Sequence, residues 1–301
     1  PGLLRVTFLR TTTSMVLAMT VVVMYLTYGE RKVVARFQQR LGPTETGPAG
    51  LIQALADALK LVAKEDFVPR GANPVLFQMA PAMSLATAVA GLSLQHVLAR
   101  RFELDAWLVT LLSVLACLVG LVGAKSYYVL THLRERRDIL TTGMSVQGFV
   151  IGVLVTLGAS LLEWGLPPGA VLDVSIPALL TGLAVGRPGC LLGGCCVGRP
   201  TGSRWGIWSS DRSLGVRRIP VQLLESASAA VLAVATWAVL VATGTRSGLL
   251  FVAGLSMYVL ARQLLFPLRA LGRATRYGRR VTTWVSAVVA VVSAVMVAAG
   301  A

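Results

Sequence analysis

The sequence predicts an all-α, polytopic integral membrane protein with about eight transmembrane helices and one amphipathic interfacial helix. Of its 301 residues, 55% are hydrophobic and only 14% are charged, and the mean hydropathy is +0.73. A soluble domain carries nearer a quarter of charged residues. Several apolar runs reach the ~20 residues that a helix needs to cross the hydrocarbon core of a bilayer. The runs lack strand alternation, and helices satisfy their own backbone groups in lipid, so we expect helices.

Eight apolar runs are candidate membrane spans by the hydropathy rule. They cover residues 12–28, 75–98, 106–124, 143–162, 171–191, 220–242, 247–266 and 281–299. The formal net charge is +15, and the basic residues lie mostly between these runs. Lys and Arg in such positions set topology and contact anionic lipid. The charge therefore does not indicate a nucleic-acid partner, and we expect a multi-pass membrane protein.

Residues 30–74 form the longest polar interruption, and part of it is amphipathic. Leu51, Leu55, Leu59 and Val62 fall on one helical face. Two Gly-Pro pairs at 42–43 and 47–48 break the chain before this stretch. A helix with such an apolar face is typical of a membrane surface, which predicts the interfacial helix here.

The stretch from Glu30 to about Pro81 resembles the H subunit of NADH-quinone oxidoreductase, the quinone-site membrane subunit of respiratory complex I. Residues that carry the resemblance include Glu30, Arg31, Lys32, Ala35, Arg36, Gln38, Arg40, Gly42, Pro43, Gly47, Pro48, Gly50, Leu51, Gln53, Ala56, Asp57, Ala58, Leu59, Lys60, Lys64, Glu65, Ala80 and Pro81. It implies that residues 1–91 form a transmembrane helix, a surface helix and a second transmembrane helix, with other respiratory subunits as partners. The quinone-site-like residues it implies are Glu30, Arg31, Arg36, Gln38 and Arg40. We find no counterpart of the family's later helices and acidic loop, so an intact quinone site is not expected.

Arginines and glycines are concentrated in the stretch VGRPGCLLGGCCVGRPT at 185–201. Arg187 follows an apolar run, and an arginine near the hydrocarbon is a functional-site hypothesis by default. Its fork of donors fits a phosphate. Tyr258, Arg262 and Arg269 are spaced to share one helical face, where they would stabilise charge on a departing phosphate. The alternative is that these arginines extend to the headgroups at helix ends.

Five short motifs in order resemble prolipoprotein diacylglyceryl transferase over residues 92–301. They are GAKSYYVL (123–130), GMSVQGFVIG (143–152), the stretch at 185–201, RIPVQLLE (218–225) and YVLARQLLFPLR (258–269). The resemblance implies transfer of a diacylglyceryl group from phosphatidylglycerol to the lipobox cysteine of a prolipoprotein, and a multi-pass location in the bacterial inner membrane. It assigns catalysis to Arg187, Tyr258 and Arg262, and substrate binding to Gln147, Gly189, Cys190, Gly198, Arg199, Arg218, Gln222, Glu225 and Arg269.

The chain departs from that family at two of these positions. Gln147 stands where the family has a histidine, and a glutamine cannot accept a proton near neutral pH. Cys190 stands where the family has an asparagine. The main expectation is therefore a diacylglyceryl transferase, with two alternatives: a membrane component like the H subunit of complex I, or a non-catalytic protein that binds anionic lipid.

The four cysteines do not predict a metal site or a disulfide framework. The spacing of Cys190, Cys195 and Cys196 is not a usual zinc pattern, and no histidine is near in the sequence. Cys117 lies inside an apolar run. We expect neither a metal nor a cofactor.

Overall fold

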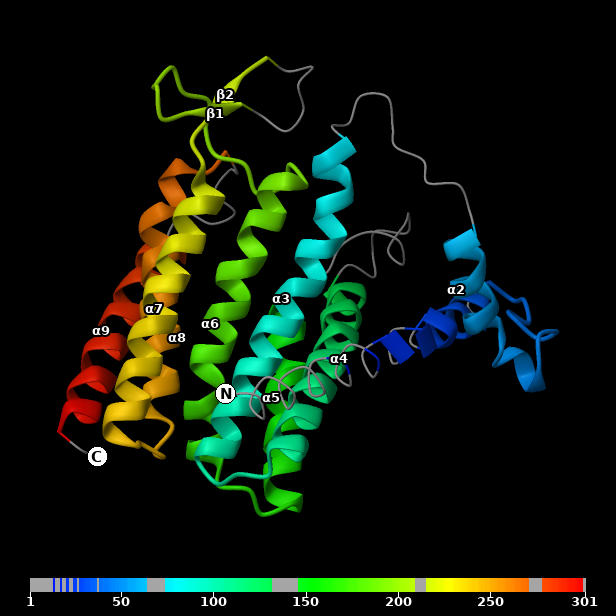
Figure 1. Cartoon of the computed structure of the whole chain (residues 1–301), viewed down its shortest axis with the longest axis horizontal. Helices are drawn as coiled ribbons and strands as arrows, with labels where there is room; N and C mark the ends of the chain where they lie inside the picture. Colours follow the sequence, from blue (N-terminus) through cyan, green and yellow to red (C-terminus); the bar gives the residue numbers. More distant parts are fainter. Residues whose placement is uncertain are drawn as a thin grey trace, which may run out of the picture. The chain divides into compact units, whose positions relative to one another are not determined.

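The computed structural model describes most of the chain as two compact units (Figure 1). The described residues are 13, 17, 20, 21, 24, 25, 27–36, 38–63, 74–131, 146–208, 215–270 and 278–299. One unit comprises Pro1–Val68 with Tyr128–Gly143, and the other comprises Pro69–Tyr127 with Met144–Ala301. Most of the predicted span at 12–28 lies outside the described residues, as do Lys64 and Glu65.

The first unit contains a helical segment at 27–36, the 3-10 helix η1 (Pro48–Gly50) and α2 (Gln53–Ala63). A tight turn joins the helical segments, because Gly50 has a φ of +80° and a Cβ there would lie 2.3 Å from the carbonyl oxygen of Pro43. The predicted amphipathic helix is α2. The apolar side chains of Leu51, Ile52, Leu55 and Leu59 are exposed on it or just before it.

The second unit is a helical bundle with one small hairpin. Its helices are α3 (Pro74–Arg101), α4 (Ala106–Thr131, of which the last four residues belong to the first unit), α5 (Val146–Glu163), α6 (Pro168–Leu192), α7 (Val221–Thr243), α8 (Leu249–Leu265), η3 (Phe266–Leu268) and α9 (Gly278–Ala298). The hairpin pairs β1 (Ile207–Trp208) with β2 (Arg217–Arg218) in antiparallel fashion. No strand was expected from the sequence.

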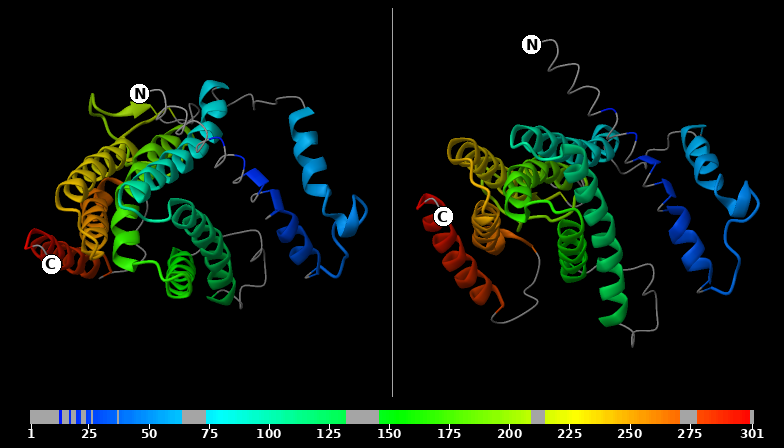
Figure 2. Two further views of the ribbon diagram at one scale, coloured as in Figure 1. Left: turned by 60° about the horizontal axis from the view of Figure 1, so that its bottom comes forward. Right: turned by 90° about the horizontal axis from the view of Figure 1, so that it is seen from below.

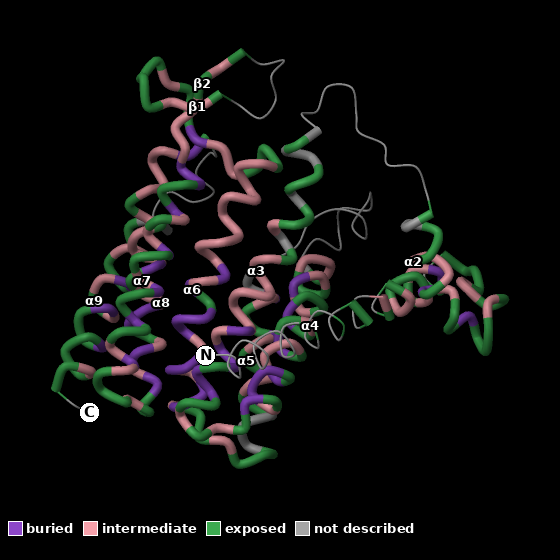
Figure 3. The backbone as a smooth tube through the Cα atoms, viewed as in Figure 1, coloured by how far each residue is buried: buried purple, intermediate pink, exposed green. Residues whose placement is uncertain are grey.

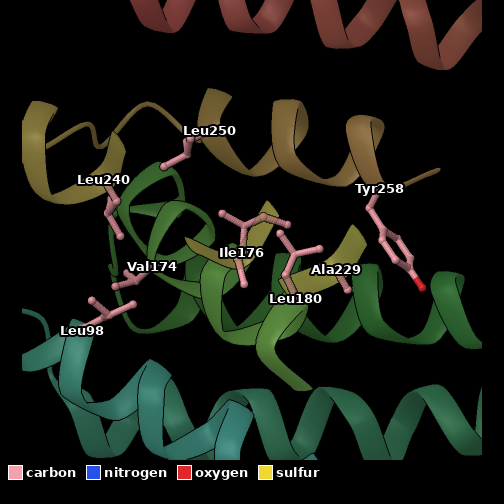
Figure 4. Packing of buried hydrophobic residues seen from close by; sticks show 9 residues of the cluster. Leu98, Val174, Ile176, Leu180, Ala229, Leu240, Leu250 and Tyr258 are labelled. Carbon is pink, nitrogen blue, oxygen red and sulfur yellow. The ribbon is translucent and has the colours of Figure 1, made fainter. Parts of the chain in front are cut away.

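Helix α6 is the centre of the bundle, packed against α3, α7 and α8. Half of its span (50%) is buried, against 11% of the α9 span, which packs on α8 at the outside (Figures 2 and 3). The core joins Val174, Ile176 and Leu180 of α6 to side chains of the neighbouring helices, including Ala229 and Leu250 (Figure 4). Small residues let α3 and α6 approach each other closely, since a Cβ on Gly91 of α3 would lie 3.2 Å from an α6 carbonyl oxygen.

Among the described residues, six helices are long and apolar enough to cross a membrane. They correspond to the predicted spans at 75–98, 106–124, 171–191, 220–242, 247–266 and 281–299. The predicted span at 143–162 is helical as α5, but its apolar part covers only Gly148–Ala159. The all-α, multi-pass architecture is confirmed, and the count of eight is not.

A buried carboxylate closes the opposite end of the bundle from the hairpin. Asp173 on α6 is 0% exposed and accepts hydrogen bonds from the backbone N–H groups of Gly248 (2.9 Å) and Phe251 (3.1 Å). The hydroxyl of Thr245 donates a third bond at 3.3 Å. A carboxylate at this position satisfies the free N–H groups at the start of α8 and complements its dipole. Asp173 therefore serves as a cap supplied by a neighbouring helix.

Candidate functional site

Two arginines, one glutamate and one tyrosine meet at the hairpin end of the bundle; we call them the arginine–glutamate cluster. Arg187 Nη1 lies 2.9 Å from Glu225 Oε2, and its Nη2 donates to the Tyr258 hydroxyl at 3.1 Å. Arg269 Nε lies 3.7 Å from the other Glu225 oxygen. The Glu225 and Arg269 side chains are 2% and 4% exposed. The Glu225 carboxylate therefore links α7 to α6 and to the segment after η3, and Arg187 extends the cluster to α8 through Tyr258.

Three members of this cluster lie on helices, and the fourth follows a proline that ends a helix. Arg187 lies near the end of α6, and Glu225 follows Val221 by one turn at the start of α7. Tyr258 is buried on the α8 face that packs on α6 and α7, and its ring extends from α8 toward the core (Figure 4). Pro267 ends α8 in the short η3, after which Arg269 is extended and turns inward.

A layer of backbone hydrogen bonds covers the cluster. Arg199 N–H donates to Leu268 O (2.8 Å), Ala270 N–H donates to Val197 O (3.0 Å), and Ile219 N–H donates to Arg199 O (3.0 Å). Gly198 is buried beneath these contacts, and a Cβ there would lie 2.2 Å from Ile219 O. The position therefore requires glycine, because backbone passes where a side chain would start.

Three side chains from the predicted binding set hold this cover in place. Arg218 Nη1 donates to Gly198 O (3.2 Å), and Arg199 Nε donates to Arg269 O (3.3 Å). The buried Gln222 donates to Cys195 O at 2.8 Å. Their hydrogen-bond partners here are backbone carbonyl oxygens, so these contacts organise the protein itself.

The structure brings together most, but not all, of the residues that the sequence singled out in this half. Arg262 is exposed on α8, while Tyr258 on the same helix is buried. Gln147 belongs to α5, and its side chain lies outside the described residues. Gly189 lies in the last turns of α6, where its carbonyl accepts the N–H of Gly193 at 2.9 Å. Glu225 proves to be the centre of the cluster rather than a peripheral contact.

Positive charge exceeds negative charge in the described part of this cluster. Arg187 and Arg269 share one carboxylate, and the half-buried Arg218 adds a third guanidinium. The Nε atoms of all three are buried without a hydrogen-bond partner. A hollow bordered by Gly198, Arg218 and Gln222 is about the size of one water molecule. As it stands, it does not accommodate a glycerophosphate.

A separate polar site lies in the first unit, between the 27–36 segment and α2. Arg31 forms an ion pair with Asp57, and Gln53 Nε2 donates to the same carboxylate at 2.9 Å. Thr46 Oγ1 donates to Gln53 Oε1 at 2.6 Å, and the Tyr28 hydroxyl donates to Ala49 O at 2.7 Å. The hydrogen bond from Gln53, with the Arg31 charge, lowers the pKa of Asp57 below its ordinary 3.8. These contacts fix α2 against the preceding helix.

The predicted quinone-site-like residues Glu30, Arg31, Arg36, Gln38 and Arg40 are all exposed. Of these, the interactions above involve only Arg31. Sequence reasoning missed the partners Asp57 and Gln53 as site residues. The i, i+4 spacing of Gln53 and Asp57, which puts them on one face of a helix, was the available signal.

Comparison with known proteins finds similarity in the first half of the chain. The NADH dehydrogenase family matches residues 11–160. The H subunit of the NADH-quinone oxidoreductase of Wolinella succinogenes is 55% identical over 69 residues, 23% of this chain and 21% of that protein. The corresponding H subunit 1 of Koribacter versatilis is 58% identical over 69 residues, which are 23% of this chain and 16% of that protein. The H subunit of Ruthia magnifica is 34% identical over 161 residues, which cover 49% of this chain and 43% of that protein.

These matches contradict the expected diacylglyceryl transferase. They name an NADH dehydrogenase family and H subunits of NADH-quinone oxidoreductases, so neither the predicted lipid transfer nor the corresponding enzyme identity holds. The five short motifs behind that expectation are mostly Gly, Arg and apolar residues, which recur at ends of membrane helices. The family match also continues past residue 91, where the resemblance to the H subunit was expected to end.

The chain spans about a fifth of the length of the first of these relatives, and 43% of the one from Ruthia magnifica. Together with its membrane-spanning helices, these relatives confirm the predicted multi-pass location in the bacterial inner membrane. Over residues 11–160 this is a membrane protein similar to the H subunit of NADH-quinone oxidoreductase.

Proposed function

We propose that the chain is a membrane component of an NADH-quinone oxidoreductase, to which it contributes a segment like the H subunit. The observation that carries the proposal is the family match over residues 11–160. The reductase activity belongs to the whole complex. The role of this chain is to bind neighbouring subunits and to line the path of a quinone.

The geometry of the first unit supports this assignment. The ion pair between Arg31 and Asp57 joins the two helical segments that the resemblance to the H subunit covers. The apolar side chains of Leu51, Leu55 and Leu59 remain exposed beside them. An exposed apolar face next to charged residues is suited to the membrane interface, where a lipophilic quinone also resides.

The experiment is affinity purification of the tagged full-length chain from mild-detergent extracts of its native host. We expect subunits of the NADH-quinone oxidoreductase to co-purify with the chain, as identified by mass spectrometry. NADH-quinone reductase activity should be present in the same fractions. Asp57→Arg should reduce both, because it places two positive charges together. The double variant Arg31→Asp with Asp57→Arg restores opposite charges and should recover co-purification.

Arg246→Ala is the matched control, since it removes an exposed arginine from the second unit. It should leave co-purification unchanged. Recovery of a properly inserted chain without any respiratory subunit would overturn the proposal.

We propose as a second candidate function that the edge of the arginine–glutamate cluster, at Arg199 and Arg218, binds an anionic lipid headgroup, without catalysis. The specific observation in favour is the excess of guanidinium groups over carboxylates, with three buried Nε atoms that make no hydrogen bond in the described structure. The headgroup, such as that of phosphatidylglycerol, would bind at the outer edge where Arg199 is exposed and Arg218 is half-buried. Guanidinium groups bind phosphate oxygens in pairs.

Native mass spectrometry of the chain in nanodiscs would test this candidate. We expect retention of phosphatidylglycerol over phosphatidylcholine, and loss of that preference in Arg199→Ala combined with Arg218→Ala. Arg246→Ala should retain it. Equal retention of the two lipids by the unaltered chain would refute headgroup binding.

A further inference from the structure

Three of the four cysteines gather where α6 ends. Cys190 lies on the last turns of α6, and Cys195 and Cys196 lie in the loop that follows. Their Sγ atoms are all within 4.8 Å of one another. The fourth, Cys117, is exposed on α4. We call the first three the thiol cluster.

The backbone of the loop takes an unfavourable conformation that folds it back on the helix. Gly194 has a φ of 68°, which suits glycine, but Cys196 has a φ of 56°, a left-handed conformation that side chains disfavour by about 1–2 kcal/mol per residue. Cys195 N–H donates to Cys190 O at 3.1 Å, which closes the turn. Strained positions persist where the surroundings over-determine them, and they concentrate at functional sites.

The loop is also held from the opposite side. Gln222, 2% exposed on α7, donates to Cys195 O at 2.8 Å. Val197 O, next to the cluster, accepts the N–H of Ala270 at 3.0 Å. Helix α7 and the segment after η3 thus hold the loop in position, and with it the three sulfur atoms.

A positively charged side chain lies close to the thiol cluster. Arg187 lies one helical turn before Cys190 and interacts electrostatically with its thiol. Metals bind the thiolate form of cysteine. Any charge that three thiolates bring is therefore partly balanced by the excess guanidinium charge of the arginine–glutamate cluster.

Only sulfur donors make up the group in the part of the chain that the structure describes. Thiolate ligands select soft ions such as Cu(I), whereas carboxylates and carbonyls select hard ones. Structural zinc sites are almost always four-coordinate, but a monovalent d10 ion is satisfied by three thiolates. We infer that Cys190, Cys195 and Cys196 form a three-coordinate thiolate site for a soft monovalent metal ion of the Cu(I) class.

The distances are consistent with this coordination. An ion about 2.3 Å from each of three sulfurs in a plane holds them ~4 Å apart. The present separations are at most 4.8 Å, so only a small contraction is needed. Binding would release the thiol protons to solvent and tie the loop to the end of α6.

The test is titration of Cu(I), under anaerobic conditions and against a colorimetric Cu(I) chelator, of the purified full-length chain in nanodiscs. We expect binding of about one equivalent, and an X-ray absorption spectrum with about three sulfur neighbours. Each of Cys190→Ser, Cys195→Ser and Cys196→Ser should abolish that high-affinity step. Cys117→Ser should leave it intact, which separates the cluster from the protein's other thiol.

Further measurements keep the inference falsifiable. Unchanged far-ultraviolet circular dichroism and gel-filtration profiles would show that the serine variants are folded. Loss of binding in Cys117→Ser, retention in Cys195→Ser, or displacement of Cu(I) by one equivalent of Zn²⁺ would overturn the proposed site. A disulfide among the three cysteines, detected by counting free thiols after anaerobic purification, would also overturn it.

Discussion

Arg187 on α6 and Glu225 on α7 form an ion pair of 2.9 Å inside a bundle of apolar helices. The Glu225 side chain is 2% exposed, and the same carboxylate also faces Arg269 from the segment after η3. Desolvating such groups is costly, and their attraction offsets the cost only when every partner is present. The pair thus makes the packing of α6, α7 and α8 dependent on one carboxylate.

Glu225→Ala should be strongly destabilising. It leaves the guanidinium groups of Arg187 and Arg269 in the protein interior without a counter-charge, and breaking a buried pair in this way costs about 3–5 kcal/mol. We expect a clear drop in the midpoint of thermal unfolding, measured by scanning fluorimetry of the chain in nanodiscs.

A triple variant tests whether the uncompensated charge, rather than lost packing, is the cause. Arg187→Met, Glu225→Leu and Arg269→Met together remove all three charges and retain apolar volume. Such replacements are often neutral or stabilising, so this variant should unfold above Glu225→Ala. If it unfolds at the same temperature or lower, the electrostatic explanation is incorrect.

Gly198→Ala should disturb the cover over the arginine–glutamate cluster. The added Cβ would lie 2.2 Å from Ile219 O and 2.9 Å from a methyl group of Val221, so the backbone must shift. Overpacking of this kind costs about 1–3 kcal/mol. Hydrogen exchange should show faster opening of the N–H groups of Arg199 and Ile219. Gly202→Ala is the control, because nothing lies within 4 Å of a Cβ there. Equal exchange in the two variants would contradict the steric argument.

Asp173→Ala should destabilise the start of α8. It removes the acceptor of the N–H groups of Gly248 and Phe251, which lie where a helix supplies no carbonyl partner of its own. Loss of a charged helix cap costs about 2 kcal/mol or more. The midpoint of thermal unfolding reports the loss. Thr245→Ala, which removes the 3.3 Å hydroxyl bond to Asp173 and an exposed 3.1 Å bond with the Ser247 hydroxyl, should have a much smaller effect. A larger effect of Thr245→Ala would show that Asp173 is not the principal cap.

Hydropathy predicted most of the helices because membrane helices depend on local composition. The spans at 171–191 and 220–242 correspond closely to α6 and α7. The β1–β2 hairpin was not predicted, since strands of two residues leave no periodic pattern. The span predicted at 143–162 is not confirmed, since the apolar part of α5 covers only Gly148–Ala159 among the described residues.

The candidate sites show a different limit. Helix spacing grouped Tyr258 with Arg262, but burial separates them: Tyr258 is buried, whereas Arg262 is exposed in the last turn of α8. The central role of Glu225 depends on contacts between α6, α7 and the segment after η3. The thiol cluster depends on the φ of Cys196, which no spacing rule foresees. The function was misassigned because short Gly- and Arg-containing motifs outweighed the long match at 30–81.

The contact between Arg31 and Asp57 should persist to an unusually low pH. The hydrogen bond from Gln53, followed by the Arg31 charge, lowers the pKa of Asp57 in the folded state below 3.8, its ordinary value. A depressed carboxyl pKa contributes stability that is present above 3.8 and is lost as the pH falls through the folded-state pKa. Hydrogen exchange of α2 should therefore be independent of pH, after correction for intrinsic rates, down to 3.8, and should accelerate only below it. Gln53→Ala removes the largest cause and should move this onset to higher pH. Asp57→Asn should abolish the pH dependence, and an onset in Asp57→Asn at the same pH as in the unaltered chain would assign the titration to another group.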